Sequence, residues 1–160
     1  MAPNLHDLAR HIIKHNQYLT LATVDNEKGM WVCILCYAYD SDFNFYFASL
    51  DTSRHSRNIT QNNAVTFAIY DSRQDWGIGV GLQIEGLIDK VSGAELPKVT
   101  AMYFSRKFPF GSATGDFAME FRKQLDNKTY NFYKIIPTKI WINNPDANVD
   151  ERVEVNLSGK

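Results

Sequence analysis

The stretch FNFYFASLDTSRHSRNITQN, residues 43–62, contains the features that decide the fold. Phenylalanine recurs at every second position from 43 to 47, which predicts a strand with one face against a core. A short helix is expected to begin at Thr52 or Ser53 and to run to about Asn62, because a hydroxyl at that position caps free backbone N–H groups. The stretch therefore predicts an aromatic strand followed by a helix start rich in basic and hydroxyl side chains.

Five further segments carry β-rich or alternating residues, which predicts a strand in each. They lie near residues 17–24, 30–39, 64–71, 80–91 and 130–142. Asn4 is expected to cap a first helix that ends near Asn16. A capping box of Ser92 and Glu95 is expected to start another helix, and a last one is expected over about 114–125. Six mainly antiparallel strands in a short chain bury their faces most easily by curling into a small barrel, with the helices as covers.

The length of 160 residues suits one domain, which we expect to span residues 1–143, with a polar and flexible tail at 144–160. Lys and Arg total 17 against 18 Asp and Glu, a net charge of −1, so no overall field attracts nucleic acid. The sequence has no apolar segment of the roughly 20 residues that a membrane span needs. We therefore expect a cytoplasmic protein that binds neither nucleic acid nor a membrane.

Two pairs of residues have the spacing of metal ligands. Cys33 and Cys36 form a C-x-x-C motif, but the surrounding residues predict a buried strand, in which positions three apart face opposite sides of the sheet. His11 and His15 are four apart on the expected first helix. We expect buried thiols in the first pair, solvated or packing side chains in the second, and no metal site.

The helix start after the aromatic strand has two interpretations. Arg54 offers a two-pronged donor for phosphate oxygens, His55 a ring donor, and Ser49, Thr52 and Ser53 neutral donors, all beside the positive end of a helix dipole. In the simpler interpretation Ser53 is an N-cap and the basic side chains are solvated. The stretch thus predicts either a phosphate site or an ordinary capped helix.

A resemblance to a known family favours the phosphate site. The succession of strand, ASLDTSRHSRNITQN and strand resembles the pyridoxamine 5′-phosphate oxidase-like, FMN-binding split-barrel superfamily, and LQIEG (residues 82–86) and IIPTKIW (135–141) extend the similarity over about residues 15–142. The Thr-x-Arg-His segment and the Phe-Pro in RKFPF (106–110) are closest to an uncharacterised bacterial branch. The resemblance implies a mainly β (α+β) fold, a six-stranded antiparallel split barrel, and a homodimer with two FMN sites at the interface.

The resemblance also implies which residues bind the cofactor. Ser49 matches the Thr or Ser at the strand end, Ser53 and Arg54 match the Ser-Arg of the phosphate motif, and His55 takes the place of a Lys. Gln83 resembles the fifth-strand glutamine often placed near the flavin ring. Asn143 stands near the place of a Trp that holds the flavin in the true oxidases, and the Arg-rich segment after it is not reproduced, so pyridoxamine phosphate oxidation is not expected.

Two functions remain open at this stage. The first is an FMN-dependent oxidoreductase of unknown substrate, with the protein supplying a phosphate anchor and a slot for the ring and with no catalytic residue assigned. The second is a non-catalytic flavin or haem-binding protein on the same barrel, with the histidines as candidate haem ligands. The cofactor expected is FMN, with haem or a deazaflavin as the alternatives.

Overall fold

The fold is seen in a computed structural model that describes residues 4–27, 29–107, 116–127, 129–147 and 149–157. The described chain forms eight strands and four helices. The strands are β1 (Tyr18–Val24), β2 (Met30–Cys36), β3 (Ala38–Tyr39), β4 (Phe45–Leu50), β5 (Ala64–Tyr70), β6 (Gly81–Lys90), β7 (Tyr130–Asn143) and β8 (Arg152–Glu154). The helices are α1 (Leu5–His15), α2 (Arg54–Gln61), α3 (Glu95–Ser105) and α4 (Asp116–Asp126).

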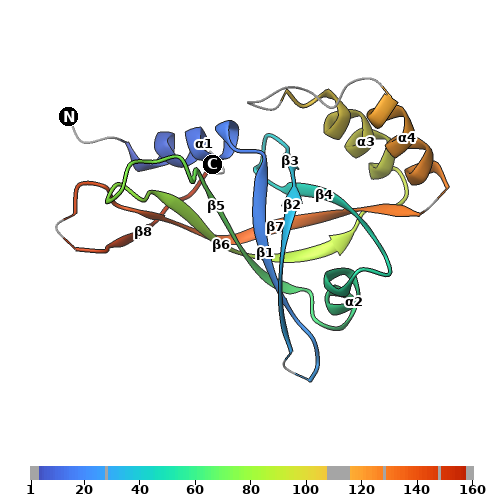
Figure 1. Ribbon diagram of the computed structural model, residues 1–160, viewed down its shortest axis with the longest axis horizontal. Coiled ribbons are helices and arrows are strands. Elements are labelled where there is room, and N and C mark those ends of the chain that lie inside the picture. The colour runs from blue at the N-terminus through green and yellow to red at the C-terminus, as the bar shows by residue number, and fades with distance from the viewer. Residues whose placement is uncertain (1–3, 28, 108–115, 128, 148, 158–160) are drawn as a thin grey trace.

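One curled antiparallel sheet forms the expected split barrel (Figure 1). Its strand order is β2-β1-β5-β6-β7-β4-β3, and β8 pairs with β7 beside this path. Helix α1 packs against β5 and β6, α2 lies against the β1–β2 hairpin, and α3 and α4 lie together at the other end (Figure 1). Helix α2 is therefore held where β4, β1 and β2 come together, which places the basic helix start at the open edge of the barrel.

Alternation along the strands produces the core. In β1 the side chains of Leu19 and Leu21 are fully buried, and in β4 those of Phe45 and Phe47 are. Each fully buried aliphatic or aromatic side chain of this size stabilises the fold by roughly 1.5–3 kcal/mol. A second, smaller cluster around Phe132 packs beneath α3 and α4. The expected strand is confirmed, with Phe45 and Phe47 in the main core. The expectation of a single buried face is wrong, because Tyr46 on the other face is buried in the second cluster.

Phe43 differs from its two neighbours in the aromatic run. It precedes β4, in the turn from β3, and has a positive φ of 59°. Its ring stacks on that of Tyr39, with 5.9 Å between centroids and 3° between planes. Phe43 therefore lies two residues before β4, in the turn and not in the strand.

The strand count expected from the sequence is wrong by two short strands. β3 is the far end of the segment expected as one strand over 30–39, and β8 lies in the segment expected as a tail. Val155 and Leu157, which follow β8, are buried in the main core. Burial of the apolar residues at alternate positions of VEVNL, residues 153–157, drives this packing. The polar residues around them make this pattern hard to recognise in the sequence.

Two expected caps have different outcomes. Asn4 caps α1 as expected, with its Oδ1 accepting from the His6 N–H at 3.0 Å. The expected capping box of Ser92 is wrong, because α3 has Ala94 at its N-cap and no side-chain cap bond. Glu95 instead accepts a hydrogen bond from Lys134 Nζ at 2.8 Å on β7. Of the expected features, the Phe-Pro at 108–109 lies outside the described residues.

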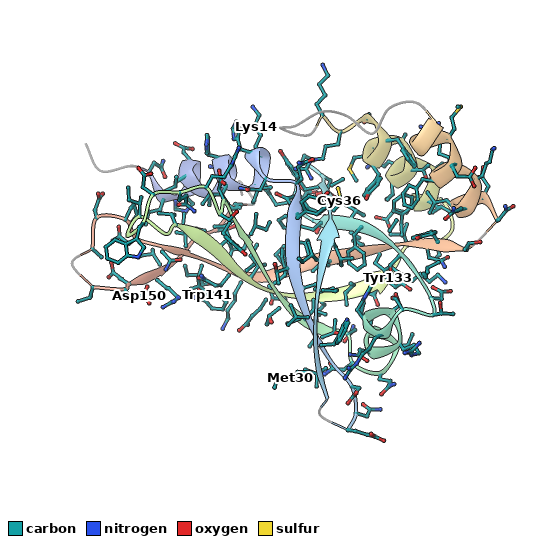
Figure 2. The ribbon with its side chains drawn as sticks, in the orientation of Figure 1. Lys14, Met30, Cys36, Tyr133, Trp141 and Asp150 are labelled. Carbon is teal, nitrogen blue, oxygen red and sulfur yellow. The ribbon has the colours of Figure 1, made fainter. Side chains whose placement is uncertain are left out.

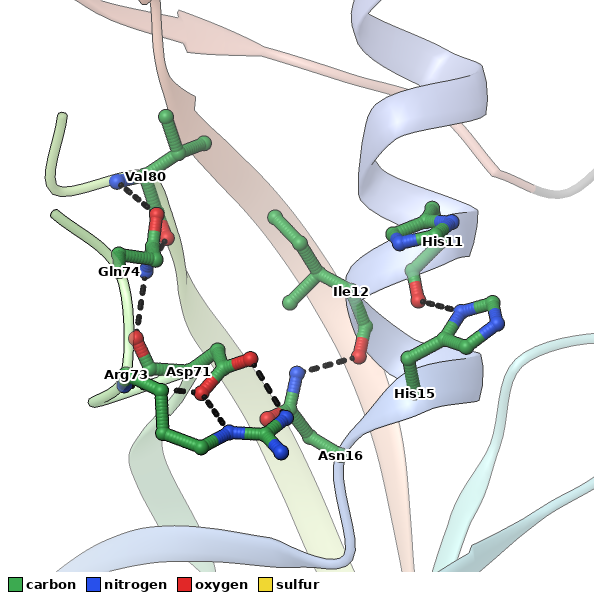
Figure 3. Close-up of polar contacts among 8 residues, drawn as sticks. All are labelled: His11, Ile12, His15, Asn16, Asp71, Arg73, Gln74 and Val80. Carbon is green, nitrogen blue, oxygen red and sulfur yellow. Dashed lines mark hydrogen bonds and ion pairs between the residues drawn. The ribbon is translucent and has the colours of Figure 1, made fainter. Parts of the chain in front are cut away.

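The glycine-rich segment between β5 and β6 is closed by one glutamine (Figure 3). Gln74 Nε2 donates to the carbonyl oxygens of Asp71 at 2.7 Å and Val80 at 2.9 Å, and its Oε1 accepts from the Val80 N–H at 2.9 Å. These hydrogen bonds join the two ends of the segment, and the Trp76 side chain between them is fully exposed. None of the described helices has the length and apolar character needed to cross a bilayer.

Candidate functional site

A serine–histidine cluster lies at the junction of β4 and α2. Ser53 is the N-cap of α2, and its Oγ accepts from the Ser56 N–H at 3.3 Å. His55 turns back from the first turn, so that its Nε2 lies 2.6 Å from Ser49 Oγ and 3.0 Å from Ser53 Oγ. Three of the predicted site residues, Ser49, Ser53 and His55, are therefore in mutual contact, and Ser49 and His55 are buried.

Burial controls the charge of His55. The pKa of its imidazole is lowered from its usual value because the folded protein desolvates the charged form. The Phe47 ring meets the imidazole edge-on, with 6.1 Å between centroids. His55 is thus held as a neutral ring in the free protein, unlike the lysine that it replaces in the family pattern, and a bound anion would have to overcome this desolvation to make it a cation.

Arg54 is the exposed cation of the cluster. Its guanidinium lies over the Trp31 ring of β2, with the central carbon 4.8 Å from the ring centroid. Arg57 is employed differently, because its Nη1 donates to the Thr52 carbonyl and so closes the turn before the helix. Arg54 is therefore the arginine of α2 that is positioned to offer its donors to a ligand.

Asp51 brings a negative charge close to the cluster, and that charge is compensated. Its carboxylate accepts from Lys90 Nζ at 2.7 Å and from the Tyr133 hydroxyl at 2.8 Å. The hydrogen bond from Lys90 is the main reason that the pKa of Asp51 lies below its usual value. Burial raises the pKa of Tyr133 to about 12, so its hydroxyl remains a donor at neutral pH. Because Asp51 is paired with Lys90, it repels an anion at the start of α2 less strongly than an unpaired carboxylate would.

Gln83 lies in a separate place, on the face of the sheet that points away from the core. This outer face is formed by alternate residues of neighbouring strands, including Thr20, Ala22, Thr66, Ala68, Gln83 and Trp141. Gln83 Nε2 donates to Asn143 Oδ1 at 3.2 Å, and Asn143 Nδ2 donates to Asp150 Oδ1 at 3.1 Å. Gln83 Oε1 is buried without a hydrogen-bond partner. A buried acceptor without a donor is uncommon and calls for a partner.

The structure does not bring Gln83 to the serine–histidine cluster within one chain. Gln83 lies seven positions before Lys90 on β6, and Lys90 contacts Asp51 beside the cluster. At roughly 3.3 Å per residue this is about 23 Å along the strand. In Figure 2, Trp141 and Asp150 lie toward the β8 end of the sheet, whereas Tyr133 lies beside α2. The five predicted site residues therefore form two groups, Ser49, Ser53, Arg54 and His55 in one and Gln83 in the other.

The prediction of a buried strand at β2 is wrong, because its outer face exposes large apolar side chains. Met30 is 80% and Ile34 is 72% exposed, and Val32 lies between them. A hollow of about 370 Å³ borders Met30 and Val32 and extends over the middle of the sheet. Contiguous exposed apolar surface is typical of a region that binds a partner or a ligand.

The remaining candidates from the sequence are the two cysteines of β2 and two histidines of α1. Cys33 and Cys36 are free thiols that are partly buried, not fully buried as expected. Burial still raises the pKa of Cys33 to about 11, so the reactive thiolate is disfavoured. The rings of His11 and His15 stack on the exposed side of α1 with centroids 3.9 Å apart, and His15 Nδ1 donates to the His11 carbonyl at 2.8 Å (Figure 3). Within the described chain no three His, Cys, Asp or Glu residues are grouped as metal ligands would be.

Tyr37, the residue after β2, has a structural role. Its side chain is fully buried, and its hydroxyl donates to the Ile13 carbonyl at 2.6 Å. Sequence reasoning also missed Asp150, which was assigned to a flexible tail, and the link from Asp150 to Gln83 through Asn143. No local motif signals such a link, because it depends on the pairing of β7 with both β6 and β8.

Comparison with known proteins agrees with this fold. The chain matches the model of the family described as pyridoxamine 5′-phosphate oxidase over residues 5–141. No curated protein sequence matches the chain.

Solved structures show the same architecture. A heme binding protein from Mycobacterium smegmatis superposes with a TM-score of 0.75 at 15% identity, covering 98% of this chain and 59% of that protein. The heme storage protein HutZ from Vibrio cholerae gives 0.72 at 14% identity, covering 88% and 95% of the two chains. An F420 reductase gives 0.54 at 22%, covering 82% and 94%. The chain spans about three fifths of the M. smegmatis protein, and likeness at these identities shows the fold alone. The family match over residues 5–141 shows that this chain belongs to the pyridoxamine 5′-phosphate oxidase family.

Proposed function

We propose that this protein is an FMN-binding flavoprotein, a homodimer with the cofactor at its interface, that acts as a flavin-dependent oxidoreductase. The observation that carries the proposal is the cluster at the start of α2, in which Arg54, Ser53, Ser49 and His55 surround a helix N-terminus. Backbone N–H groups in the first turn of a helix lack helical partners and attract anions. In a member of this family, such a cluster fits the phosphate of FMN.

Each residue of the cluster has a defined part in this proposal. Arg54 gives a two-pronged, charge-assisted contact to the phosphate, because its guanidinium is exposed and steadied by Trp31. Ser49 and Ser53 supply hydroxyl donors. His55 contributes a neutral N–H, or a cation if the phosphate dianion raises its pKa against the effect of burial.

The fit of the flavin ring is supported by a second observation. Gln83 Oε1 is a buried acceptor that lacks a donor, and it borders a hollow on the outer face. When bound, FMN supplies hydride or electron transfer. The chain's own residues hold the phosphate, offer an acceptor to the ring and shield it from water. The catalytic residues and the substrate remain unassigned, and a cytoplasmic location remains a prediction.

The distance between the two groups of residues supports the proposed homodimer. The two groups lie about 23 Å apart along β6. One cofactor that contacts both Arg54 and Gln83 would therefore take these residues from different copies. The exposed apolar side chains of Met30, Val32 and Ile34 on β2 provide the kind of surface that a second copy would cover.

A non-catalytic haem-binding protein is the second candidate. It is favoured by the two structural neighbours whose names record heme binding and heme storage. On this chain α1 carries three exposed histidines as candidate ligands: His6, His11 and His15. A deazaflavin is the third candidate ring, since one neighbour is an F420 reductase.

An absorbance titration of the purified protein with FMN tests the proposal. We expect saturable changes in the flavin bands and an affinity at least about tenfold lower in Arg54→Ala, because a charge-assisted contact to phosphate is lost. Arg122→Ala is the matched control, since this exposed arginine lies on α4, away from the cluster. An absence of flavin changes, together with a Soret shift on addition of haem, would instead support the haem-binding candidate.

A further inference from the structure

We infer that Asn143 and Asp150 are positioning residues, which orient the Gln83 amide so that the hollow on the outer face favours a ring edge with an N–H. The inference rests on the proposed function, because it concerns the ring of the cofactor whose phosphate the cluster at α2 would hold. It goes further by naming the residues that orient the amide of Gln83.

The hydrogen bonds that link Gln83, Asn143 and Asp150 have a defined direction. A carboxylate only accepts, so Asp150 Oδ1 takes a hydrogen bond from the Nδ2 of Asn143 at 3.1 Å. Its other oxygen, Oδ2, lies 3.0 Å from Arg152 Nη1 in an exposed ion pair. Asn143 must then present Oδ1 to Gln83, where it accepts from Gln83 Nε2 at 3.2 Å. Asp150 thereby determines the orientation of both amides.

This orientation of the amides leaves the Oε1 atom of Gln83 without a hydrogen-bond donor. With Nε2 of Gln83 turned to Asn143, Oε1 becomes a bare acceptor, and it is buried with no donor near it. Leaving such a group unpaired costs free energy, so a donor that reaches it gains the full value of the hydrogen bond. Because the chain fixes the amide, a ligand with an acceptor at this position meets repulsion, whereas a ligand with an N–H meets an attraction.

The hollow beside Gln83 is lined by small side chains and by an aromatic ring. It measures about 310 Å³ and is bordered by Trp141, by the small side chains of Ala22 and Ala68, and by Thr20 and Thr66. Small residues on neighbouring strands give a flat floor, and Lys139 Nζ lies 5.6 Å from the Trp141 ring centroid. A flat floor with one aromatic wall suits a planar ring better than a branched chain.

These features distinguish the candidate rings. Flavins and deazaflavins carry an imide N–H on the edge of the ring system, whereas haem presents propionates and apolar groups at its rim. The bare acceptor of Gln83 therefore selects for the imide-bearing rings and against haem. Because Gln83 and Arg54 lie far apart along one chain, the ring would contact Gln83 of one copy while its phosphate is held by the other.

The test compares FMN with its N3-methyl derivative, which lacks the imide N–H. We expect the parent protein to bind the methyl derivative at least tenfold more weakly in an absorbance or fluorescence titration. This ratio should fall to near one in Gln83→Leu. It should also fall in Asp150→Asn, which has the same size but no longer forces one amide orientation. Glu85→Gln is the control, because Glu85 borders the same hollow and leaves the chain of amides intact.

The outcomes separate the inference from the proposed function. If FMN and the methyl derivative bind equally well to the parent protein, the inference is overturned while flavin binding stands. An unchanged ratio in a folded Asp150→Asn protein overturns the positioning role of Asp150. If the protein binds haem and no flavin, both the inference and the proposed function fail. The parent protein alone decides the first point, so the test does not depend on any variant folding.

Discussion

The guanidinium of Arg54 lies over the Trp31 ring, with 4.8 Å between its central carbon and the ring centroid. This contact joins the start of α2 to β2 at the open edge of the barrel. It orders a long side chain that would otherwise lose conformational freedom when it binds an anion. Trp31 therefore prepares Arg54 for a ligand without having to touch that ligand.

Replacing Trp31 with Leu should weaken FMN binding about two- to fivefold, which corresponds to the ~0.5–1 kcal/mol of an exposed cation–π contact. Trp31→Phe should retain part of the effect, since an aromatic face remains. The measurement is the same absorbance titration with FMN, with a thermal melt to check the fold. A Trp31→Leu protein that binds FMN as well as the parent would show that Arg54 needs no platform.

Burial of His55 makes stability depend on pH. Its folded pKa is lowered, so the unfolded chain binds more protons wherever the pH lies between the lowered value and about 6.5. Stability should therefore fall as the pH drops through about 6.5 and stop falling once the folded form is also protonated. Urea unfolding at several pH values, compared with His55→Gln, measures this; a parent and variant with the same pH dependence would refute it.

Gly86 marks the bulge where β6 faces Pro137 of β7. A Cβ at Gly86 would lie 2.8 Å from both Ile135 Cγ2 and the Ile136 carbonyl oxygen. We expect Gly86→Ala to lower the free energy of unfolding by roughly 1–3 kcal/mol, the usual cost of overpacking. Gly79→Ala is the matched control, because nothing lies within 4 Å of its added Cβ. Chemical denaturation of both variants gives the comparison, and equal stabilities would contradict the prediction.

Leu157 should contribute to stability although it lies in the polar C-terminal segment. Its side chain is 3% exposed within the main core, whereas Val149 is exposed on the same segment. Leu157→Ala is expected to cost about 2–5 kcal/mol, as for other buried leucines, and Val149→Ala less than about 0.5 kcal/mol. Thermal or urea unfolding distinguishes them. A neutral Leu157→Ala would mean that the segment does not pack on the barrel in solution.

Much of this fold could be predicted because its signals are local. The period-two alternation of Phe45 and Phe47 identifies β4, Ser53 has the hydroxyl that an N-cap needs, and Pro137 predicts the irregularity in β7 that the register shows. Each of these features depends on a few neighbouring residues. The contact of Ser49 with His55 could also be anticipated, since the helix start follows the strand directly.

The rest depends on contacts between distant segments. Ser92 has the sequence of a cap, but Glu95 bonds to Lys134 on β7, so tertiary contacts decide how α3 begins. The β8 strand forms because β7 offers it a partner, and Asp150 reaches Gln83 only through that pairing. No propensity or motif in the sequence contains this information, which is why the acceptor at Gln83 became visible only in the structure.

In the proposed homodimer one FMN is held between two copies, by Arg54 of one and Gln83 of the other. The most direct measurement is FMN binding to a mixed dimer, in which one copy carries Arg54→Ala and the other Gln83→Leu, isolated through two different affinity tags. The account predicts that each variant alone binds weakly, whereas the mixed dimer has one site of parental affinity, because one interface retains both residues. A mixed dimer with no site of parental affinity would contradict the account.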